Sequence, residues 1–251
     1  MERWFDKVAV VTGSSTGIGA ACVKDLLNNG FQVCGLARRE TKLQELGSSL
    51  SEEQQKKYFP MKCDVTNEDS IKKAFEWIEQ NLGGIDVLIN NAGVIKYTDL
   101  VKENNTVDLQ SVVDTNLLGV AFCTREAFQS MRKRQFPGHI ILINSIAGHT
   151  VPNFGPDLPS FNIYPATKFG ITAMSEVYRQ EFLKYGTKVK ITSVSPGGTA
   201  TDLFPEEYSK LTNNYPWLSP EDVSNAIMYV ISTPPHVQIH ELTIKPIGEP
   251  M

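Results

Sequence analysis

The sequence predicts a single α/β domain built around a parallel sheet, and three observations lead to that fold class. Short apolar runs alternate with longer stretches of helical periodicity along the chain. Most of these runs are apolar almost throughout, which indicates strands that are buried on both faces. A glycine-rich loop follows the first run directly and leads into a helical stretch. We therefore expect a doubly wound sheet of about seven parallel strands with helices on both faces.

The first half of the chain is expected to hold four of these strands. They are predicted at 7–12, 31–37, 57–64 and 85–90. A helix from Gly17 to about Asn29 separates the first two and ends at Gly30, and a helix of about 67–81 precedes the fourth strand.

The second half of the chain continues the same alternation. Strands are predicted at 139–145, 189–194 and 241–245, and long helices at about 107–133 and 164–183. A further helix opens at Ser219, where serine can act as N-cap, Pro220 takes the first helical position and two acids follow. It ends at Pro234-Pro235. This order of elements is that of a Rossmann fold.

Composition and charge exclude several classes of protein. The 251 residues, 41% hydrophobic and 21% charged, suffice for one domain with a sizeable core. A net charge of -4 argues against nucleic acid as the main partner. No apolar stretch has membrane-spanning length, and the charged residues among the first ten lead us to expect no signal peptide. The four cysteines and four histidines show no metal-ligand spacing. We expect buried reduced thiols, no metal and a cytoplasmic location.

The glycine-rich loop is the first candidate binding site. In the run TGSSTGIG at 12–19, Gly13 permits a tight turn, while Gly17 and Gly19 allow a pyrophosphate to approach closely. The N–H groups at the start of the following helix would face the phosphates. A plain strand-to-helix turn is the alternative interpretation. The candidate dinucleotide contacts are Gly13, Ser15, Thr16, Gly17, Ile18 and Gly19.

Two arginines at the end of the second strand predict which dinucleotide binds. An NAD site usually has Asp or Glu there for the ribose 2′-hydroxyl, whereas an NADP site uses Arg for the 2′-phosphate. This chain has Arg38 and Arg39, and no acid before Glu40. Two guanidiniums can hold a phosphate dianion, whereas the start of a helix is otherwise a poor place for cations. The sequence therefore predicts NADP(H).

Further candidates follow the third and fourth strands. Asp64 could accept a hydrogen bond from an adenine amine, or it could be a turn or capping residue before the next helix. Asn91 could contact the cofactor, tie neighbouring strands together, or do both. The candidate contacts are Asp64, Val65, Asn91, Ala92 and Gly93.

Four polar residues form the candidate catalytic set. Tyr164 and Lys168 stand four residues apart, on one face of a predicted helix. A tyrosine is a poor base at neutral pH, and we expect the Lys168 ammonium to favour its phenolate by lowering the pKa. Ser145 could hold the substrate oxygen, and Asn116 could hold a water that links Lys168 to solvent. Each residue alone could be a packing or surface residue; their joint occurrence, beside a dinucleotide loop, predicts hydride transfer.

These motifs resemble the short-chain dehydrogenase/reductase family over essentially the whole chain. The matching residues are TGSSTGIG at 12–19, Asp64, NNAG at 90–93, Asn116, Ser145, YPATK at 164–168, and Pro196-Gly197 with Thr201. Four longer tracts resemble insect farnesol dehydrogenases and related NADP-dependent steroid and carbonyl reductases: the start MERWFDKVAVVTGSSTGIG, the turn GLARR, the stretch INSIAGHTVPN and the tail STPPHVQIHELTIKP.

The resemblance carries several expectations. It implies a catalytic tetrad of Asn116, Ser145, Tyr164 and Lys168, with Tyr164 and Lys168 also contacting the cofactor. It implies a homodimer or homotetramer packed through the two long helices, and a cofactor half of about 1–145 and a catalytic and substrate half of about 145–251 within the single domain 1–251. The residues implied to contact the nicotinamide are Pro196, Gly197, Thr199 and Thr201.

The loop between Ser145 and Tyr164 is the candidate substrate wall. It is rich in proline and glycine, which exclude helix, and it carries several apolar residues. It could line a pocket, or it could be a connector that packs its own side chains. The segment after Thr201 resembles the lid of the family. The candidate substrate contacts are Ser145, Ala147, His149, Val151, Phe154, Leu203 and Phe204, with a merely solvated His149 as the alternative.

The sequence as a whole predicts an NADP(H)-dependent oxidoreductase that interconverts an apolar alcohol with its aldehyde or ketone. Farnesol is the leading substrate prediction. The alternatives are a ketosteroid or general carbonyl reductase and a protein that senses NADP(H) without chemistry. No nucleic acid or membrane partner is expected.

Overall fold

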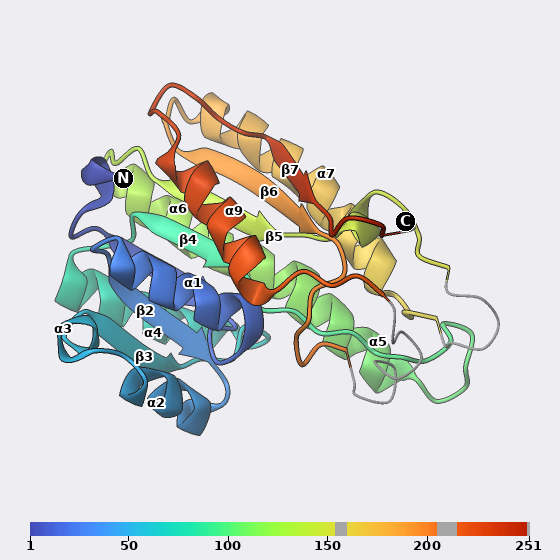
Figure 1. Ribbon diagram of the computed structural model, residues 1–251. Coiled ribbons are helices and arrows are strands. Elements are labelled where there is room, and N and C mark those ends of the chain that lie inside the picture. The colour runs from blue at the N-terminus through green and yellow to red at the C-terminus, as the bar shows by residue number, and fades with distance from the viewer. Residues whose placement is uncertain (154–159, 205–214, 250–251) are drawn as a thin grey trace.

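A computed structural model describes residues 1–153, 160–204 and 215–249. Its centre is a sheet of seven parallel strands in the order β3-β2-β1-β4-β5-β6-β7 (Figure 1), as the apolar runs predict. The strands are β1 (Val8–Thr12), β2 (Gln32–Ala37), β3 (Tyr58–Lys62), β4 (Val87–Asn90), β5 (His139–Ile143), β6 (Lys190–Pro196) and β7 (Glu241–Ile244).

Helices cover both faces of this sheet (Figure 1). The helices are α1 (Gly17–Asn28), α2 (Glu40–Ser48), α3 (Glu52–Gln55), α4 (Glu68–Leu82), α5 (Thr106–Val113), α6 (Gly119–Lys133), α7 (Tyr164–Lys184) and α9 (Pro220–Ser232). Successive residues of β1 point to opposite faces, so that Val8 and Val10 pack with α4, α6 and α7, whereas Ala9 and Val11 pack with α1 and α9. Short helical turns are η1 (Glu2–Trp4), η2 (Asp114–Leu118) and η3 (Ile146–Gly148).

The strand order reverses beside β1, and this positions the candidate site. β1 pairs with β2 on one side and with β4 on the other. In doubly wound sheets, ligands bind outside the carboxyl ends of the strands at such a reversal. The loops after β1, β2, β4 and β5, which carry most of the sequence-predicted site residues, meet at this edge.

Several strand ends differ from the sequence prediction by one or two residues, and two differences affect predicted site residues. The single helix expected over 107–133 is divided into α5 and α6 by a π-helical segment, Asp114–Leu118. Within that segment the Asn116 side chain is bonded to the backbone of Val94. The strand expected over 139–145 ends at Ile143, because Ser145 begins a new turn as the N-cap of η3.

Three further expectations concern the cysteines, metal sites and membrane-spanning helices. All four cysteines are buried, unpaired thiols, as the sequence predicts. Within residues 1–153, 160–204 and 215–249, no group of histidine, cysteine or acidic side chains has the arrangement of a metal site. Within the same ranges, no helix is long and apolar enough to cross a membrane.

Asp86 lies just before β4 and joins this end of the strand to the start of β1 and the end of α6. Its buried carboxylate accepts a hydrogen bond from the Val8 amide at 2.9 Å and pairs with Arg134 Nη1 at 2.8 Å. We expect Asp86→Ala to lower the free energy of unfolding by about 3 kcal/mol, because two donors lose their partner. Urea denaturation measures this free energy of unfolding. Glu53→Ala is the control, because it removes only an exposed ion pair with Lys56 and should change the free energy of unfolding by less than about 1 kcal/mol. Equal effects of the two substitutions would contradict this role of Asp86.

Candidate active site

A single cavity at the carboxyl edge of the sheet gathers most of the predicted site residues. It runs from the glycine loop, past the ends of β2, β4 and β5, to the segment around Trp217. The predicted residues that line it are Gly13, Ser15, Thr16, Gly17, Ile18, Arg38, Arg39, Asp64, Val65, Asn91, Ala92, Gly93, Ser145, Ala147, Tyr164, Lys168, Pro196, Gly197, Thr199, Thr201, Leu203 and Phe204.

The glycine loop has the shape of a phosphate cradle. Gly13 has φ +64°, and a Cβ there would lie 2.8 Å from the Cα of Ala92, so no larger residue fits. α1 begins at Gly17, and its N-cap Thr16 makes no side-chain capping bond. The first N–H groups of α1 therefore remain available for an anion. Gly19 does not line the cavity; it allows the Asn91 side chain to pack against the loop.

One arginine of the predicted pair lies directly against this loop. Arg39 Nη2 donates to Ser15 Oγ at 3.1 Å and to Thr16 Oγ1 at 2.9 Å. Arg39 Nη1 also lies 4.0 Å from the exposed carboxylate of Asp202, across the mouth of the cavity. Arg38 lines the same end. The two guanidiniums and two hydroxyls make this end rich in donors suited to a phosphate.

For Asp64 and Asn91, the structure shows the structural roles that the sequence left open. Asp64 Oδ1 accepts from the amide and hydroxyl of Thr66, so Asp64 forms a turn before α4. Asn91 Nδ2 donates to the carbonyls of Thr12 and Gly13, which ties β4 to β1. Both residues also line the cavity, so a cofactor contact remains a prediction.

Tyr164 and Lys168 begin α7 and are both buried in the wall of the cavity. Burial raises the pKa of Tyr164 to about 12, against a hydrogen bond with Ser145 that lowers it. Lys168 Nζ donates to the carbonyl of Ile143 at 2.7 Å and lies 5.6 Å from the centre of the Tyr164 ring. Burial lowers the pKa of Lys168 to about 8.

Burial raises the pKa of Tyr164 more than the hydrogen bond with Ser145 lowers it. The Lys168 ammonium is held beside the Tyr164 ring by a carbonyl of β5. That Lys168 lowers the pKa of Tyr164 stays a prediction. Ser145 itself is fixed as the N-cap of η3, where its Oγ accepts from the Ala147 amide at 3.1 Å. Its hydroxyl hydrogen remains available to a second oxygen.

Asn116 is held away from the cavity surface. Its Oδ1 accepts from the Val94 amide at 2.9 Å, and its Nδ2 donates to the Val94 carbonyl at 3.0 Å. Nδ2 also lies 3.3 Å from Thr167 Oγ1, inside the first turn of α7. Asn116 therefore joins the loop after β4 to the helix that carries Tyr164. Its predicted link to solvent through a water stays a prediction.

The substrate end of the cavity differs in part from the sequence prediction. Leu203, Phe204 and Ala147 line it. In the part of the chain that the structure describes, His149 and Val151 do not line it. His149 Nε2 instead lies 3.0 Å from Ser195 Oγ and 3.3 Å from Glu241 Oε1, and Val151 is exposed. Phe154 lies outside the described residues.

An unbroken series of aromatic rings forms the wall beside Tyr164. Phe161 stands edge-on to Tyr164 with ring centres 6.1 Å apart, and edge-on to Tyr97 at 5.5 Å. Phe204 lies 6.1 Å from Phe161 and 5.0 Å from Trp217. The Tyr97 hydroxyl donates to the carbonyl of Leu203, which joins the loop after β4 to the segment after β6.

Sequence reasoning missed three aromatic residues of the cavity. Tyr97, Tyr215 and Trp217 line the cavity but belong to no motif. The available signal is positional, since each lies in a connection that follows the carboxyl end of a strand, where ligand-contacting residues gather. The loop before Tyr164 is expected either to line a pocket or to pack its own side chains. Its residue Phe161 lines the cavity, which fits a pocket wall.

The match to a family model decides the affiliation. The short chain dehydrogenase model matches residues 7–212. The chain belongs to the short-chain dehydrogenase/reductase family. The resemblance expected from the motifs is thereby confirmed, and the protein is an oxidoreductase of this family.

Two relatives of the same family are similar in sequence to this chain over nearly its full length. The chain is 47% identical over 249 residues to a farnesol dehydrogenase from Aedes aegypti, with 99% of each chain covered. It is 38% identical over 255 residues to Dehydrogenase/reductase SDR family member 11 from Homo sapiens, covering 98% of this chain and 96% of that protein. The solved closed form of a serine dehydrogenase complexed with NADP⁺ is similar with a TM-score of 0.85 at 29% identity, covering 97% and 96%.

Proposed function

We propose that this short-chain dehydrogenase/reductase interconverts an apolar alcohol with its aldehyde or ketone, using NADP(H), and that farnesol is its substrate. One observation carries the proposal: Tyr164 and Ser145 lie between a phosphate cradle and an aromatic wall in one cavity. The similarity to a farnesol dehydrogenase of Aedes aegypti supports the choice of alcohol.

The residues of the cradle fit a dinucleotide, and the catalytic residues fit proton transfer beside it. A bound nicotinamide would accept or supply the hydride. In oxidation, the Tyr164 phenolate takes the proton of the substrate hydroxyl while Ser145 donates a hydrogen bond to the same oxygen. In reduction, the Tyr164 hydroxyl returns the proton. We thus assign cofactor binding mainly to residues 1–145 and catalysis and substrate binding mainly to 145–251.

The aromatic wall supports an apolar substrate. Phe161, Phe204 and Trp217 offer ring faces and edges rather than ionic partners, and such surfaces favour hydrocarbon chains. An unsaturated isoprenoid chain matches this lining, whereas a charged substrate would lose its hydration without compensation.

The decisive experiment is a spectrophotometric assay of the purified protein. Farnesol is supplied with NADP⁺ or NAD⁺, and a hydroxysteroid and its ketone serve as comparisons. With farnesol and NADP⁺, we expect the absorbance of the reduced cofactor to increase with time. Turnover of the steroid without turnover of farnesol would replace the substrate while keeping the chemistry. Tight NADPH binding with no turnover of any alcohol or ketone would favour a sensor.

We further propose that the protein is a homodimer or homotetramer in the cytoplasm, packed through α6 and α7. Phe169, Val177 and Leu183 expose apolar side chains along α7, and the buried thiols suit a reducing compartment. We expect Val177→Arg to lower the molecular mass measured by light scattering to that of a smaller assembly, because a charge would be buried in the contact. Tyr229→Arg, on α9, is the control. An unchanged mass for Val177→Arg would exclude this face.

A further inference from the structure

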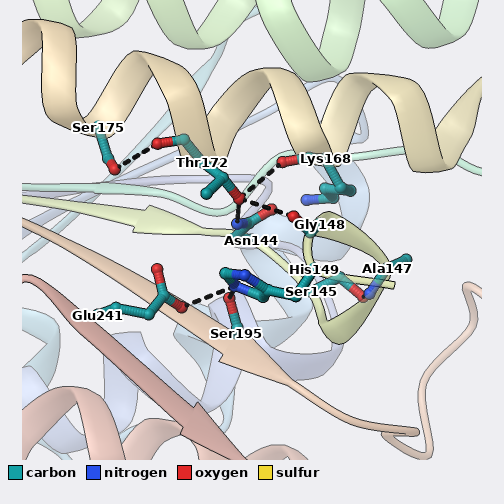
Figure 2. A network of polar contacts seen from close by, with 10 residues as sticks. All are labelled: Asn144, Ser145, Ala147, Gly148, His149, Lys168, Thr172, Ser175, Ser195 and Glu241. Atoms are coloured by element: carbon teal, nitrogen blue, oxygen red, sulfur yellow. Dashed lines mark hydrogen bonds and ion pairs between the residues drawn. The ribbon is translucent and has the colours of Figure 1, made fainter. Parts of the chain in front are cut away.

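Thr172 contacts both ends of the loop that carries Ser145. It lies on α7 one turn beyond Lys168, on the side of the helix that faces β5 and η3 (Figure 2). Asn144 immediately precedes Ser145, and Gly148 ends the η3 turn that Ser145 begins. The side chain of Thr172 reaches both, although it does not line the cavity in the described part of the chain.

The hydroxyl of Thr172 is fully engaged in these contacts. Thr172 Oγ1 accepts a hydrogen bond from Asn144 Nδ2 at 2.9 Å. Its hydrogen is directed to the carbonyls of Gly148, at 3.0 Å, and Lys168, at 3.3 Å. The bond to Lys168 is local to the helix, but the other two cross from α7 to the Ser145 loop. One hydroxyl thereby holds the residue before Ser145 and the end of the turn after it.

Gly148, at the end of the η3 turn, packs closely against Asn144 and the backbone of α7. A Cβ on Gly148 would lie 2.7 Å from Asn144 Oδ1 and 2.8 Å from the carbonyl of Lys168. Asn144 is buried, at 3% exposure, and its backbone N–H donates to the carbonyl of Val194 on β6. The Ser145 loop therefore lies against the backbone of α7 at Lys168, one turn from Tyr164. Thr172 joins the loop to the helix one turn further on.

We propose that Thr172 is a positioning residue for the reaction, which fixes the Ser145 hydroxyl relative to the Tyr164 hydroxyl through Asn144 and Gly148. The proposal rests on the proposed oxidoreductase function, since it assigns a role within that site. Ser145 and Tyr164 belong to different elements. Their hydrogen bond therefore requires that the Ser145 loop and α7 keep a fixed position relative to each other. A misplacement of about 1 Å of a reacting group can cost about 100-fold in rate.

The test compares three variants of the full chain. Thr172→Val keeps the side-chain shape and removes the hydroxyl, whereas Thr172→Ser keeps the hydroxyl. Ser175→Ala is the matched control, because Ser175 also donates from α7, at 2.8 Å, but to the carbonyl of Thr172 within the helix (Figure 2). The substrate is whichever alcohol the natural protein oxidises. kcat, KM, the NADPH dissociation constant and the pH dependence of kcat are measured for each.

Thr172→Val is expected to lower kcat by about 10-fold or more, with NADPH affinity within about 2-fold of the natural protein. Its kcat for oxidation should also reach half of the maximum at a higher pH, because the hydrogen bond from Ser145 holds the pKa of Tyr164 lower. Thr172→Ser and Ser175→Ala should retain the natural kcat and pH profile. A merely structural role would lower the melting temperature without moving the pH profile.

Crystal structures of the natural protein and Thr172→Val provide a readout that needs no turnover. A longer separation between Ser145 Oγ and Tyr164 Oη in the variant supports the proposal, even if the natural protein oxidises none of the alcohols tried. An unchanged separation, or an unchanged kcat and pH profile, overturns it. If Thr172→Val does not fold, Thr172→Ala takes its place with the same expected results.

Discussion

Tyr164→Phe is expected to abolish turnover while leaving NADPH binding nearly intact. The change removes one oxygen, and that oxygen is the candidate proton acceptor and donor of the site. General acid–base catalysis by a positioned side chain contributes about 10²- to 10⁴-fold, so we expect kcat to fall by about 10³-fold or more. The phenylalanine ring would still pack against Phe161, so the wall of the cavity should keep its shape.

The measurement pairs steady-state kinetics with NADPH binding followed by fluorescence. Tyr229→Phe is the matched control, because Tyr229 is exposed on α9 on the other side of the sheet and its hydroxyl has no place in the mechanism. Its kcat should equal that of the natural protein. Turnover by Tyr164→Phe within about 10-fold of the natural protein would remove Tyr164 from the role of acid and base.

The pH dependence should follow from the environment of Tyr164. Burial raises the pKa of this phenol to about 12. Oxidation uses the phenolate, so its kcat should rise with pH through the alkaline range. Reduction uses the protonated phenol, so its kcat should stay level and fall only as Tyr164 ionises. A kcat for oxidation that rises with pH while the kcat for reduction stays level, measured between pH 6 and about 10.5, would support one group serving both directions. Parallel slopes in the two directions would contradict it.

The strands and the phosphate loop could be predicted from the sequence because their signals are local. A strand buried on both faces favours apolar residues, and β1 and β4 are buried along their length. The glycine loop likewise depends on backbone freedom at particular positions, such as Gly13 with its positive φ. Such features are present in the residues themselves, before any contact between distant segments forms.

The directions of side chains could not be predicted in the same way, because they depend on segments distant in sequence. Lys168 bonds to a carbonyl of β5, and the π-helical segment places Asn116 against Val94. His149 lies four residues beyond Ser145, yet it contacts Ser195 on β6 and Glu241 on β7 instead of the cavity. Residue spacing along the chain carries no information about these partners.

Arg39→Ala is expected to weaken NADPH binding by about 10- to 100-fold and to leave NADH binding nearly unchanged, because a charge-assisted bidentate contact contributes about 1.5 to 3 kcal/mol. Arg39 lies against Ser15 and Thr16 at the phosphate end of the cavity. Replacement by aspartate should reverse the cofactor preference, since a carboxylate repels the 2′-phosphate and can accept from the 2′-hydroxyl of NADH.

The neighbours of Arg39 sharpen this prediction. The carboxylate of Asp202 lies 4.0 Å from Arg39 Nη1 and would compete with a phosphate for that guanidinium. Asp202→Asn should therefore strengthen NADPH binding modestly and leave NADH binding unchanged. Arg38→Ala tests the second guanidinium that lines the same end.

Cofactor affinities for this series are best compared at two salt concentrations, because screening weakens contacts between charges more than contacts between neutral groups. Arg132→Ala, whose guanidinium stacks on Tyr185 away from the cavity, is the control for loss of a cation. An NADPH preference that survives in the Arg38→Ala, Arg39→Ala double variant would contradict the assignment of the 2′-phosphate to this pair. It would leave the hydroxyls and helix N–H groups of the glycine loop as the source of the preference.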